Sequence, residues 1–168
     1  GSGYFDGTGD YLSLAANAAF TVPSSTSFTI EAWIYITNLA YANGNIICAN
    51  SSTSSGYAFL YNPTIGLRLY ANGGTVDINQ GSVTGWTANT WYHVAAVRNG
   101  ASAITLYRNG VSVATGSSTS SFGTGPFYVG GSPSDAAYFN GYIDDFRFTN
   151  GVARYTTTFT PPTAAFPN

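Results

Sequence analysis

The sequence predicts an all-β domain built as a two-sheet antiparallel β-sandwich, and three observations carry this prediction. Some short runs along the chain alternate apolar and polar side chains, and others are rich in β-branched and aromatic residues. Both patterns are typical of strands. Six Asn-Gly dipeptides, which tolerate the positive φ angles of tight hairpin turns, occur at positions 43, 72, 99, 109, 140 and 150. No segment shows sustained helical periodicity. Frequent tight reversals favour a sandwich or jelly roll over parallel β-α-β units.

The clearest single strand covers residues 28–36, where apolar and other side chains alternate strictly. Its even-numbered residues are all apolar and share one face, whereas its odd-numbered residues, which include Glu31 and Trp33, share the other. Further strands are predicted at residues 11–14, 46–49, 57–61, 67–70, 76–79, 127–129 and 142–148.

Three short runs rich in β-branched and aromatic residues, separated by two Asn-Gly turns, predict an antiparallel meander. The first run begins Trp91-Tyr-His-Val, the second begins at Ile104, and the third begins at Val111. The prolines at positions 161, 162 and 167 exclude the last residues from a central strand, because proline removes a donor from the hydrogen-bond ladder. We expect residues 1–160 to form the domain and residues 161–168 to form an extended tail.

Composition indicates a folded domain with an unusually uncharged surface. The 168 residues suit one domain, and 44% of them are apolar, which is enough for a core. Only 7% are charged, against roughly 25% in average proteins. Such a surface suits hydrogen bonding to neutral ligands such as sugars, or packing against further copies of the chain.

The basic residues exclude two classes of function. The chain has no lysine, and its five arginines are scattered along the sequence. Nucleic-acid binding depends on clustered basic side chains that neutralise phosphates, and docking on anionic membranes needs a similar cluster. We therefore predict neither a nucleic-acid partner nor docking on an anionic membrane. Because no apolar run approaches the length of a membrane span, we also predict no membrane insertion. The single cysteine, Cys48, sits in an apolar run and is expected to behave as a small core residue.

Four segments together resemble the laminin-G-like and pentraxin-like domains of the concanavalin A-like lectin/glucanase superfamily, and they occur in that family's order. They are Phe5-Asp-Gly-Thr-Gly-Asp-Tyr-Leu12, Phe28-Thr-Ile-Glu-Ala-Trp-Ile-Tyr35, Trp91-Tyr-His-Val-Ala-Ala-Val-Arg-Asn-Gly100 and Gly141-Tyr-Ile-Asp-Asp-Phe-Arg-Phe148. The resemblance implies a concanavalin A-like jelly roll. The ending from Thr149 to Thr156, with Phe159-Thr-Pro-Pro, is similar to versions of this domain in phage virion proteins.

The superfamily includes glycoside hydrolases, which use two facing carboxylates, yet this chain has few candidates for such a pair. Glu31 is its single glutamate, and no other carboxylate is near it in sequence. Asp144 and Asp145 are adjacent, so on a strand they point to opposite faces and cannot pair. His93 is the only histidine and lies in a predicted strand. We therefore predict that the protein is not an enzyme and has no catalytic residues.

The family resemblance implies a structural calcium ion (Ca²⁺), with Asp144 at a ligand position. Asp6 and Asp10, in the glycine-rich first hairpin, could add carboxylate oxygens, the ligand type that calcium prefers. The alternative is that Asp6 and Asp10 satisfy the turn backbone and that Asp145 pairs with Arg147.

Sugar binding requires exposed aromatic rings and planar hydrogen-bonding groups. Trp33 and Trp91 belong to strand motifs and are expected in the core, whereas Trp86 lies in turn-like sequence and is expected to be exposed. The other candidates lie in or beside predicted loops and are Tyr41, Tyr61, Asn62 and Tyr138. For each candidate, packing against the edge of the sandwich is the alternative to ligand contact.

These observations favour a non-catalytic, lectin-like carbohydrate-binding adhesion module, displayed on a virion or a cell surface. Its expected partner is a neutral glycan or surface polysaccharide. The alternative is a structural or interaction module that contacts other subunits of a virion or surface assembly and binds no sugar.

Overall fold

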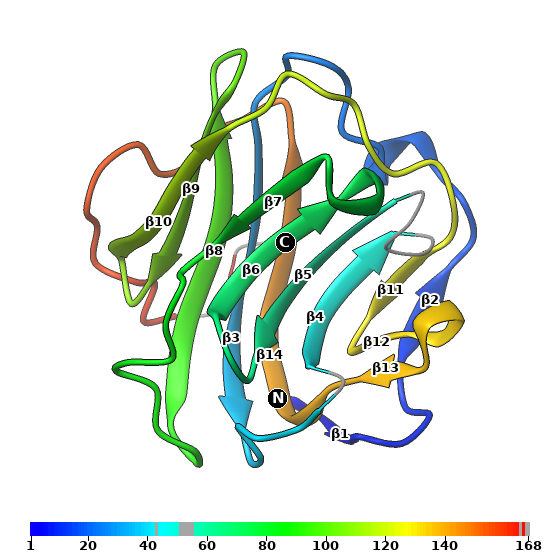
Figure 1. Cartoon of the computed structure of the whole chain (residues 1–168), viewed down its shortest axis with the longest axis vertical. Helices are drawn as coiled ribbons and strands as arrows, with labels where there is room; N and C mark the ends of the chain where they lie inside the picture. Colours follow the sequence, from blue (N-terminus) through cyan, green and yellow to red (C-terminus); the bar gives the residue numbers. More distant parts are fainter. Residues whose placement is uncertain (43, 51–55, 165, 167–168) are drawn as a thin grey trace.

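The computed structural model describes residues 1–42, 44–50, 56–164 and 166, and it confirms the predicted two-sheet antiparallel sandwich (Figure 1). Asn43, the start of the first predicted Asn-Gly turn, lies outside the described residues, as do the end residues 165, 167 and 168 of the predicted tail. Helical structure among the described residues is confined to three short 3-10 turns, η1 (Ala18–Phe20), η2 (Asn72–Gly74) and η3 (Pro133–Asp135). None of the described helical segments is long and apolar enough to cross a membrane.

Two six-stranded sheets form the layers of the sandwich. The first sheet has the order β1 (Gly3–Asp6), β14 (Asn140–Asn150), β3 (Phe28–Ile36), β8 (Trp91–Asn99), β9 (Ala103–Arg108) and β10 (Val111–Ser117). The second has the order β2 (Leu12–Leu14), β11 (Phe127–Val129), β4 (Asn45–Asn50), β5 (Tyr57–Asn62), β6 (Gly66–Ala71) and β7 (Val76–Asn79). A two-stranded ribbon pairs β12 (Gly131–Ser132) with β13 (Ala137–Tyr138).

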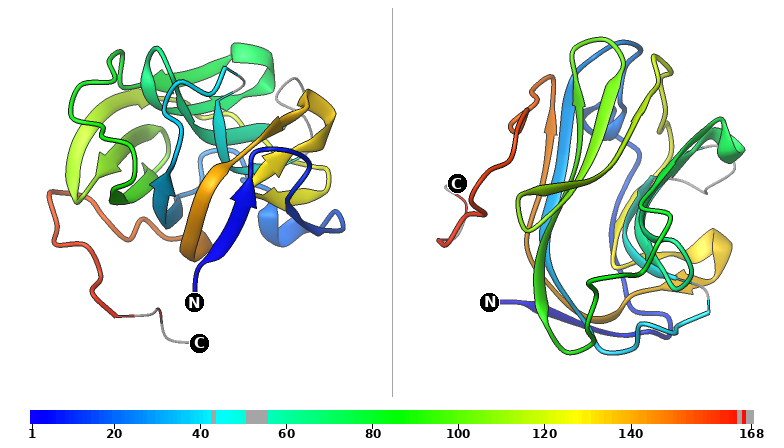
Figure 2. Two further views of the ribbon diagram at one scale, coloured as in Figure 1. Left: turned by 90° about the horizontal axis from the view of Figure 1, so that it is seen from below. Right: turned by 60° about the vertical axis from the view of Figure 1, so that its left-hand side comes forward.

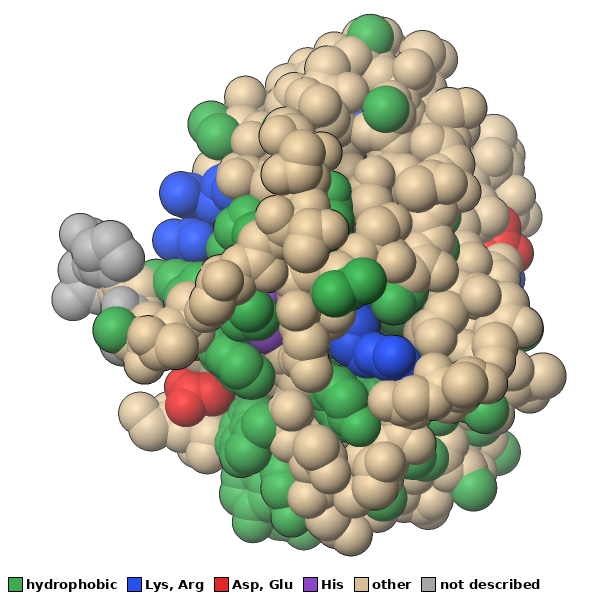
Figure 3. All heavy atoms as spheres, turned by 90° about the vertical axis from the view of Figure 1, so that its left-hand side faces the viewer, with side chains coloured by type: hydrophobic (Ala, Val, Ile, Leu, Met, Phe, Trp, Pro, Cys, Tyr) green, Lys and Arg blue, Asp and Glu red, His purple; other side chains and the backbone are tan. Residues whose placement is uncertain are grey.

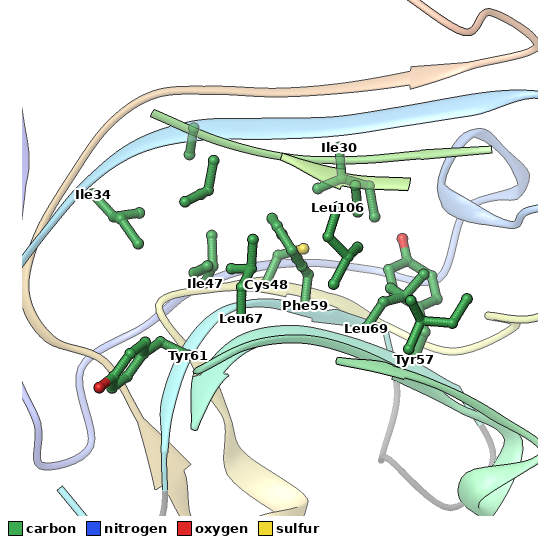
Figure 4. Packing of buried hydrophobic residues seen from close by; sticks show 14 of the residues in the cluster. Ile30, Ile34, Ile47, Cys48, Tyr57, Phe59, Tyr61, Leu67, Leu69 and Leu106 are labelled. Carbon is green, nitrogen blue, oxygen red and sulfur yellow. The ribbon is translucent and has the colours of Figure 1, made fainter. Parts of the chain in front are cut away.

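The apolar face of each sheet points into one shared core (Figure 4). Ile30 and Ile34 on β3 face Phe59 and Leu67 on the opposite sheet, and all four are fully buried. Cys48 is also buried there, as expected of a small core residue. Burial of apolar area, at about 25 cal/mol per Å², is the main force that holds the two sheets together.

The predicted meander is present as β8, β9 and β10, with both turns where the sequence places them. Asn109 and Gly110 connect β9 to β10 with φ angles of 49° and 77°, the left-handed values that a two-residue hairpin turn needs. Gly110 has a second reason to lack a side chain, because an added Cβ would lie 1.7 Å from the Phe159 carbonyl oxygen. The turn thus also makes room for a later part of the chain.

That later part, residues 152–164, runs along the outside of the first sheet and is called the C-terminal segment (Figure 2). The Thr29 hydroxyl on β3 donates to the Val152 carbonyl (2.9 Å), and the Phe159 amide donates to the Gly110 carbonyl (3.0 Å). Tyr155 and Phe159 pack on a small apolar cluster of β8 and β9. The segment therefore covers one half of the sheet's outer face and leaves the other half open.

Candidate functional site

Trp86, the tryptophan expected to be exposed, is buried, with 8% of its surface accessible. Its ring packs between Tyr61 and Tyr92 at centroid distances of 4.9 and 4.7 Å, and its Nε1 donates to Gln80 Oε1 (2.9 Å). The Arg108 guanidinium lies 5.1 Å from the ring centroid. The expectation of exposure is wrong because the turn-like segment folds its indole against the sandwich.

The tyrosines among the predicted sugar-binding residues are largely engaged inside the protein. Tyr61 is fully buried in the main core. The half-buried Tyr41 donates its hydroxyl to the Gly7 carbonyl (2.6 Å), and Tyr138 stacks on Tyr11 at a centroid distance of 6.4 Å. These contacts are those of side chains that pack the edge of the sandwich.

Asn62 lies at the rim of a shallow hollow of about 310 Å³ on the outer face of the second sheet. Ile46 and Leu60 form part of its apolar lining, and Arg68 and Tyr70 stand beside them. The Arg68 guanidinium already donates to both carboxylate oxygens of Asp77 (2.8 and 2.7 Å) and lies 4.4 Å from the Tyr70 ring centroid. The hydrogen bonds from Arg68 thereby lower the pKa of Asp77. Asp135 also lines the hollow.

Trp33 and Trp91 do not lie in the core as expected. Trp91 has 39% of its surface exposed, and Trp33 is half-buried on the outer face of the first sheet. The alternation of β3 gives the reason, since Trp33 shares the face of Glu31 and not that of the buried isoleucines. The expectation failed because membership of a strand motif does not say which face a residue occupies.

Four aromatic residues on adjacent strands stand directly opposite one another and form an aromatic ladder across the first sheet. Tyr35 on β3 pairs with Trp91 on β8 and with Tyr142 on β14, and Tyr142 pairs with Tyr4 on β1. Successive ring centroids lie 5.5, 5.6 and 5.0 Å apart from Trp91 to Tyr4. Tyr4 has 59% of its surface exposed. The ladder lies on the half of the face that the C-terminal segment leaves open.

A hollow of about 290 Å³ adjoins the ladder at its Trp91 end. Trp33, Trp91, Asp144 and Asp145 line it together with residues 162–164. Trp33 Nε1 donates to the Pro162 carbonyl (3.3 Å), which ties the C-terminal segment to the indole as one wall of the hollow. Figure 3 shows hydrophobic side chains gathered at the lower left, with acidic side chains just above them.

The two aspartates line the same hollow, contrary to the prediction that they point to opposite faces. A register irregularity between Asp144 and Arg147 interrupts the pairing of β14 with β3, and Asp145 there adopts a left-handed φ of 46°. A β-bulge of this kind redirects a side chain. Arg147 pairs with Glu31 and not with Asp145, so the predicted Asp145–Arg147 pair is wrong. Among the described residues neither aspartate has an ion-pair partner.

The three predicted calcium ligands do not converge on one point. Asp6 Oδ1 accepts from the Thr8 amide (2.6 Å) and Asp10 Oδ2 accepts from the Asp6 amide (3.2 Å), as in a turn that satisfies its own backbone. Asp6 pairs with Asn140, and Asp144 stands four residues further along β14, about 13 Å away at the rise of a strand. No group of three or more His, Cys, Asp or Glu among the described residues could hold a metal ion.

Calcium binding therefore stays a prediction, but these three aspartates lie too far apart to hold one ion together. We expect the melting temperature to be the same with excess EGTA and with added calcium chloride, measured by differential scanning fluorimetry. An ion bound only by the folded state stabilises it by mass action. A fall of several degrees in EGTA would show that calcium binds through other ligands.

Glu31 and His93, the single glutamate and the single histidine, meet beneath the C-terminal segment. His93 Nε2 lies 3.2 Å from Glu31 Oε2, and neither side chain is exposed to solvent. Tyr155 donates its hydroxyl to Glu31 Oε2 (2.6 Å), and Arg147 Nη2 lies 2.7 Å from Oε1. Glu31 and His93 are buried beneath this segment, and the contacts of Glu31 are those of a structural ion pair.

Burial alone would raise the pKa of Glu31. The hydrogen bonds from His93, Tyr155 and Arg147 outweigh burial, so the pKa lies below its ordinary value. Glu31 is therefore held as a carboxylate that three side chains from distant parts of the sequence share.

The sheet order and the antiparallel pairing define a concanavalin A-like jelly roll. The family model Laminin_G_3 of the concanavalin A-like lectin/glucanases superfamily matches residues 6–156, and the chain belongs to this family. The resemblance to the concanavalin A-like superfamily is thereby confirmed, whereas the similarity to phage virion proteins stays a prediction. No curated protein matches the chain.

Solved structures with the same fold are distant in sequence. Domain 4 of AbnA, an extracellular arabinanase from Geobacillus stearothermophilus solved in complex with arabinotriose, is 16% identical with a TM-score of 0.61, over 89% of this chain and 82% of that one. A pentraxin from Limulus polyphemus is 16% identical with a TM-score of 0.58, over 86% and 73%. Mouse laminin alpha1 domains LG4-5 are 16% identical with a TM-score of 0.62, over 97% of this chain and 47% of that one.

Proposed function

We propose that the protein is a non-catalytic module that binds a neutral glycan at the aromatic ladder and the hollow beside it. The observation that carries the proposal is the aromatic ladder, with Trp91 and Tyr4 exposed at its ends and Tyr35 and Tyr142 half-buried between them, next to two carboxylates that have no ion-pair partner among the described residues. Display on a virion or a cell surface is part of the proposal.

The aromatic rings and the two carboxylates offer a sugar two different kinds of contact. The carbon–hydrogen faces of a sugar ring are apolar and stack on an aromatic ring, which buries area that both would otherwise expose to water. The Asp144 and Asp145 carboxylates are acceptors and would receive hydrogen bonds from the sugar hydroxyls. Trp33 is held by its bond to Pro162, so this wall of the site is positioned before any ligand arrives.

The sealing of Glu31 supports a non-catalytic role, because the remaining carboxylates at the open site are the adjacent pair Asp144 and Asp145. The fold itself occurs in AbnA domain 4, whose structure contains arabinotriose. That likeness supports the proposal at the level of fold.

Replacing Trp91 with alanine is expected to weaken glycan binding about 10-fold or more, because the indole contacts the ligand in both the ladder and the hollow. Binding would be measured on a glycan array and then by titration calorimetry with the best ligand. Leu12→Ala is the matched control, since Leu12 is an exposed apolar residue on the other sheet. Silence of the wild-type protein across the array would reject the proposal.

The same exposed aromatic face also favours a second candidate, the structural or interaction module. Large exposed apolar patches mark protein interfaces as well as ligand sites. In that case the protein would self-associate or capture an assembly partner and bind no sugar. Sedimentation of the wild-type and Trp91→Ala proteins separates the two, because only an interface role makes the oligomeric state depend on Trp91.

A further inference from the structure

Resting on the glycan-binding function, we propose that the ligand is a linear, neutral polysaccharide chain that lies across the strands along the whole ladder, and that it is bound as a single soluble chain and not as a crystalline surface. Three features of the ladder carry this proposal: its length, the angles between its rings, and the charges around it.

The ladder is too long for one sugar. Its residues occupy β8, β3, β14 and β1, four adjacent strands in direct register. Strands lie about 4.8 Å apart, so the four positions span about 14 Å across the sheet. A ring that stacks on one aromatic side chain covers roughly that side chain, and the remaining rings then contact the next sugars of the same chain. A monosaccharide would leave most of the ladder unused.

The rings do not lie in one plane. Neighbouring rings are inclined by 55° between Trp91 and Tyr35, by 80° between Tyr35 and Tyr142, and by 47° between Tyr142 and Tyr4. A flat crystalline face could stack on only some of these rings at once. A free chain can rotate each sugar about its glycosidic bonds and can therefore follow the inclined rings one after another.

The surrounding charges select against acidic polysaccharides. Asp144 and Asp145 line the Trp91 end of the site, and a carboxylated or sulfated sugar would be repelled there. The chain has no lysine, and each arginine is engaged elsewhere: Arg68 with Asp77, Arg98 and Arg108 with backbone carbonyls, Arg147 with Glu31, and Arg154 with Thr149. A neutral chain is not repelled by the carboxylates and needs no basic partner.

The two ends of the ladder give a test. Trp91 stands beside the hollow, whereas Tyr4 is on the edge strand at the far end, so only a long ligand reaches both. Affinity would be measured by calorimetry for linear gluco-, manno-, xylo- and arabino-oligosaccharides, from monosaccharide to hexasaccharide, with the wild-type, Tyr4→Ala, Trp91→Ala and Leu12→Ala proteins. Sedimentation with crystalline cellulose would test the flat surface.

We expect affinity of one series to rise at each step up to several sugars. We expect Tyr4→Ala to weaken the hexasaccharide about 2- to 10-fold and to leave the disaccharide unchanged, whereas Trp91→Ala weakens both and Leu12→Ala weakens neither. Equal affinity for monosaccharide and hexasaccharide, or binding to crystalline cellulose, overturns the extended-chain proposal and leaves glycan binding standing. Absence of binding in all four series, together with silence on the array, overturns glycan binding itself.

Discussion

Replacing Glu31 with alanine is expected to lower the free energy of unfolding by about 3 to 5 kcal/mol, the usual cost of breaking a buried ion pair by removing one partner. The Glu31 carboxylate is fully buried and is shared by Arg147, His93 and Tyr155. Its loss leaves the Arg147 charge without its carboxylate partner and the Tyr155 hydroxyl without its acceptor. Domains of this size are stable by only about 5 to 15 kcal/mol, so a large part of the total would be lost.

Urea unfolding followed by tryptophan fluorescence measures this change. Asp77→Asn is the matched control, because Asp77 is also paired with an arginine but lies at the surface, where such pairs contribute about 0 to 1 kcal/mol. Glu31→Gln keeps the shape of the side chain and is expected to fall between the two. A Glu31→Ala loss no larger than that of Asp77→Asn would show that the cluster does not stabilise the fold.

The pH dependence of stability follows from the same carboxylate. Its pKa is lower in the folded protein than the ordinary value of 4.5, so folding is favoured at pH values above that value. The contribution is lost as the pH falls below about 4.5 and through the folded pKa, because the unfolded chain then binds the proton first. Between pH 7 and pH 3, the free energy of unfolding, measured by urea unfolding at each pH, should therefore change less for Glu31→Gln than for the wild-type protein.

Loss of Glu31 should also reach the proposed binding site. Glu31 holds Tyr155, and the same C-terminal segment continues to Pro162, which bonds Trp33 and walls the hollow. A segment released at Tyr155 is less firmly fixed at Pro162. We attribute to this segment both the sealing of one half of the sheet and the shape of the site on the other half.

The fold could be predicted because its determinants are local in sequence. Alternation in Phe28–Ile36 gives a strand with a buried face, and Asn109-Gly110 gives a two-residue hairpin whatever the rest of the chain does. The two-sheet arrangement then follows from the number of strands and from the family resemblance.

The site could be predicted less well because it depends on which surfaces the folded chain covers. Alternation places Trp33 on the face of Glu31, but it does not reveal that residues 152–164 cover Glu31 and leave Trp33 half-exposed. The contact of Tyr155 with Glu31 joins residues 124 positions apart. The exposure predicted for Trp86 is wrong for the same reason, since the burial of this loop residue depends on Tyr61 on β5 and Tyr92 on β8.

One further signal was present but ambiguous. The pair Asp144-Asp145 in a strand segment with bulky neighbours is compatible with a regular strand and with a bulge, and these two place Asp145 on opposite faces. Aspartate tolerates the left-handed conformation better than most residues, which makes a bulge there possible without a glycine. The structure has the bulge, and with it both carboxylates reach the hollow.

Replacing Arg98 with alanine is expected to lower the free energy of unfolding by about 2 to 4 kcal/mol, because partly buried carbonyls would lose a charged donor and a cavity would remain where the buried side chain was. Arg98 is fully buried, and its hydrogen bonds within the described part of the chain go to backbone carbonyls. Its guanidinium donates to Thr26 (2.6 Å), Ser118 (3.3 Å) and Ser120 (2.8 Å), and also to Pro23. One side chain thus joins two loops that are far apart in sequence.

The planar fork of the guanidinium explains why lysine should not replace it. Lysine has three donors on one nitrogen and cannot reach carbonyls that lie on different sides of a planar group. Arg98→Lys should therefore recover only part of the stability lost in Arg98→Ala, whereas Arg68→Ala at the surface should cost about 1 kcal/mol or less. Equal stability of Arg98→Lys and the wild-type protein would mean that charge alone, and not the fork, holds the loops.

Arg98 and Trp91 stand at opposite ends of β8, so stability and binding can be separated on one strand. Phe28, which pairs with Arg98, lies at one end of β3, and Tyr35, which pairs with Trp91, lies near the other. Below its melting temperature, Arg98→Lys should keep the wild-type affinity for the glycan, because the ladder and the hollow contain none of the loops that Arg98 joins. Trp91→Ala should show the reverse, with weaker binding and nearly unchanged unfolding, since its side chain is exposed.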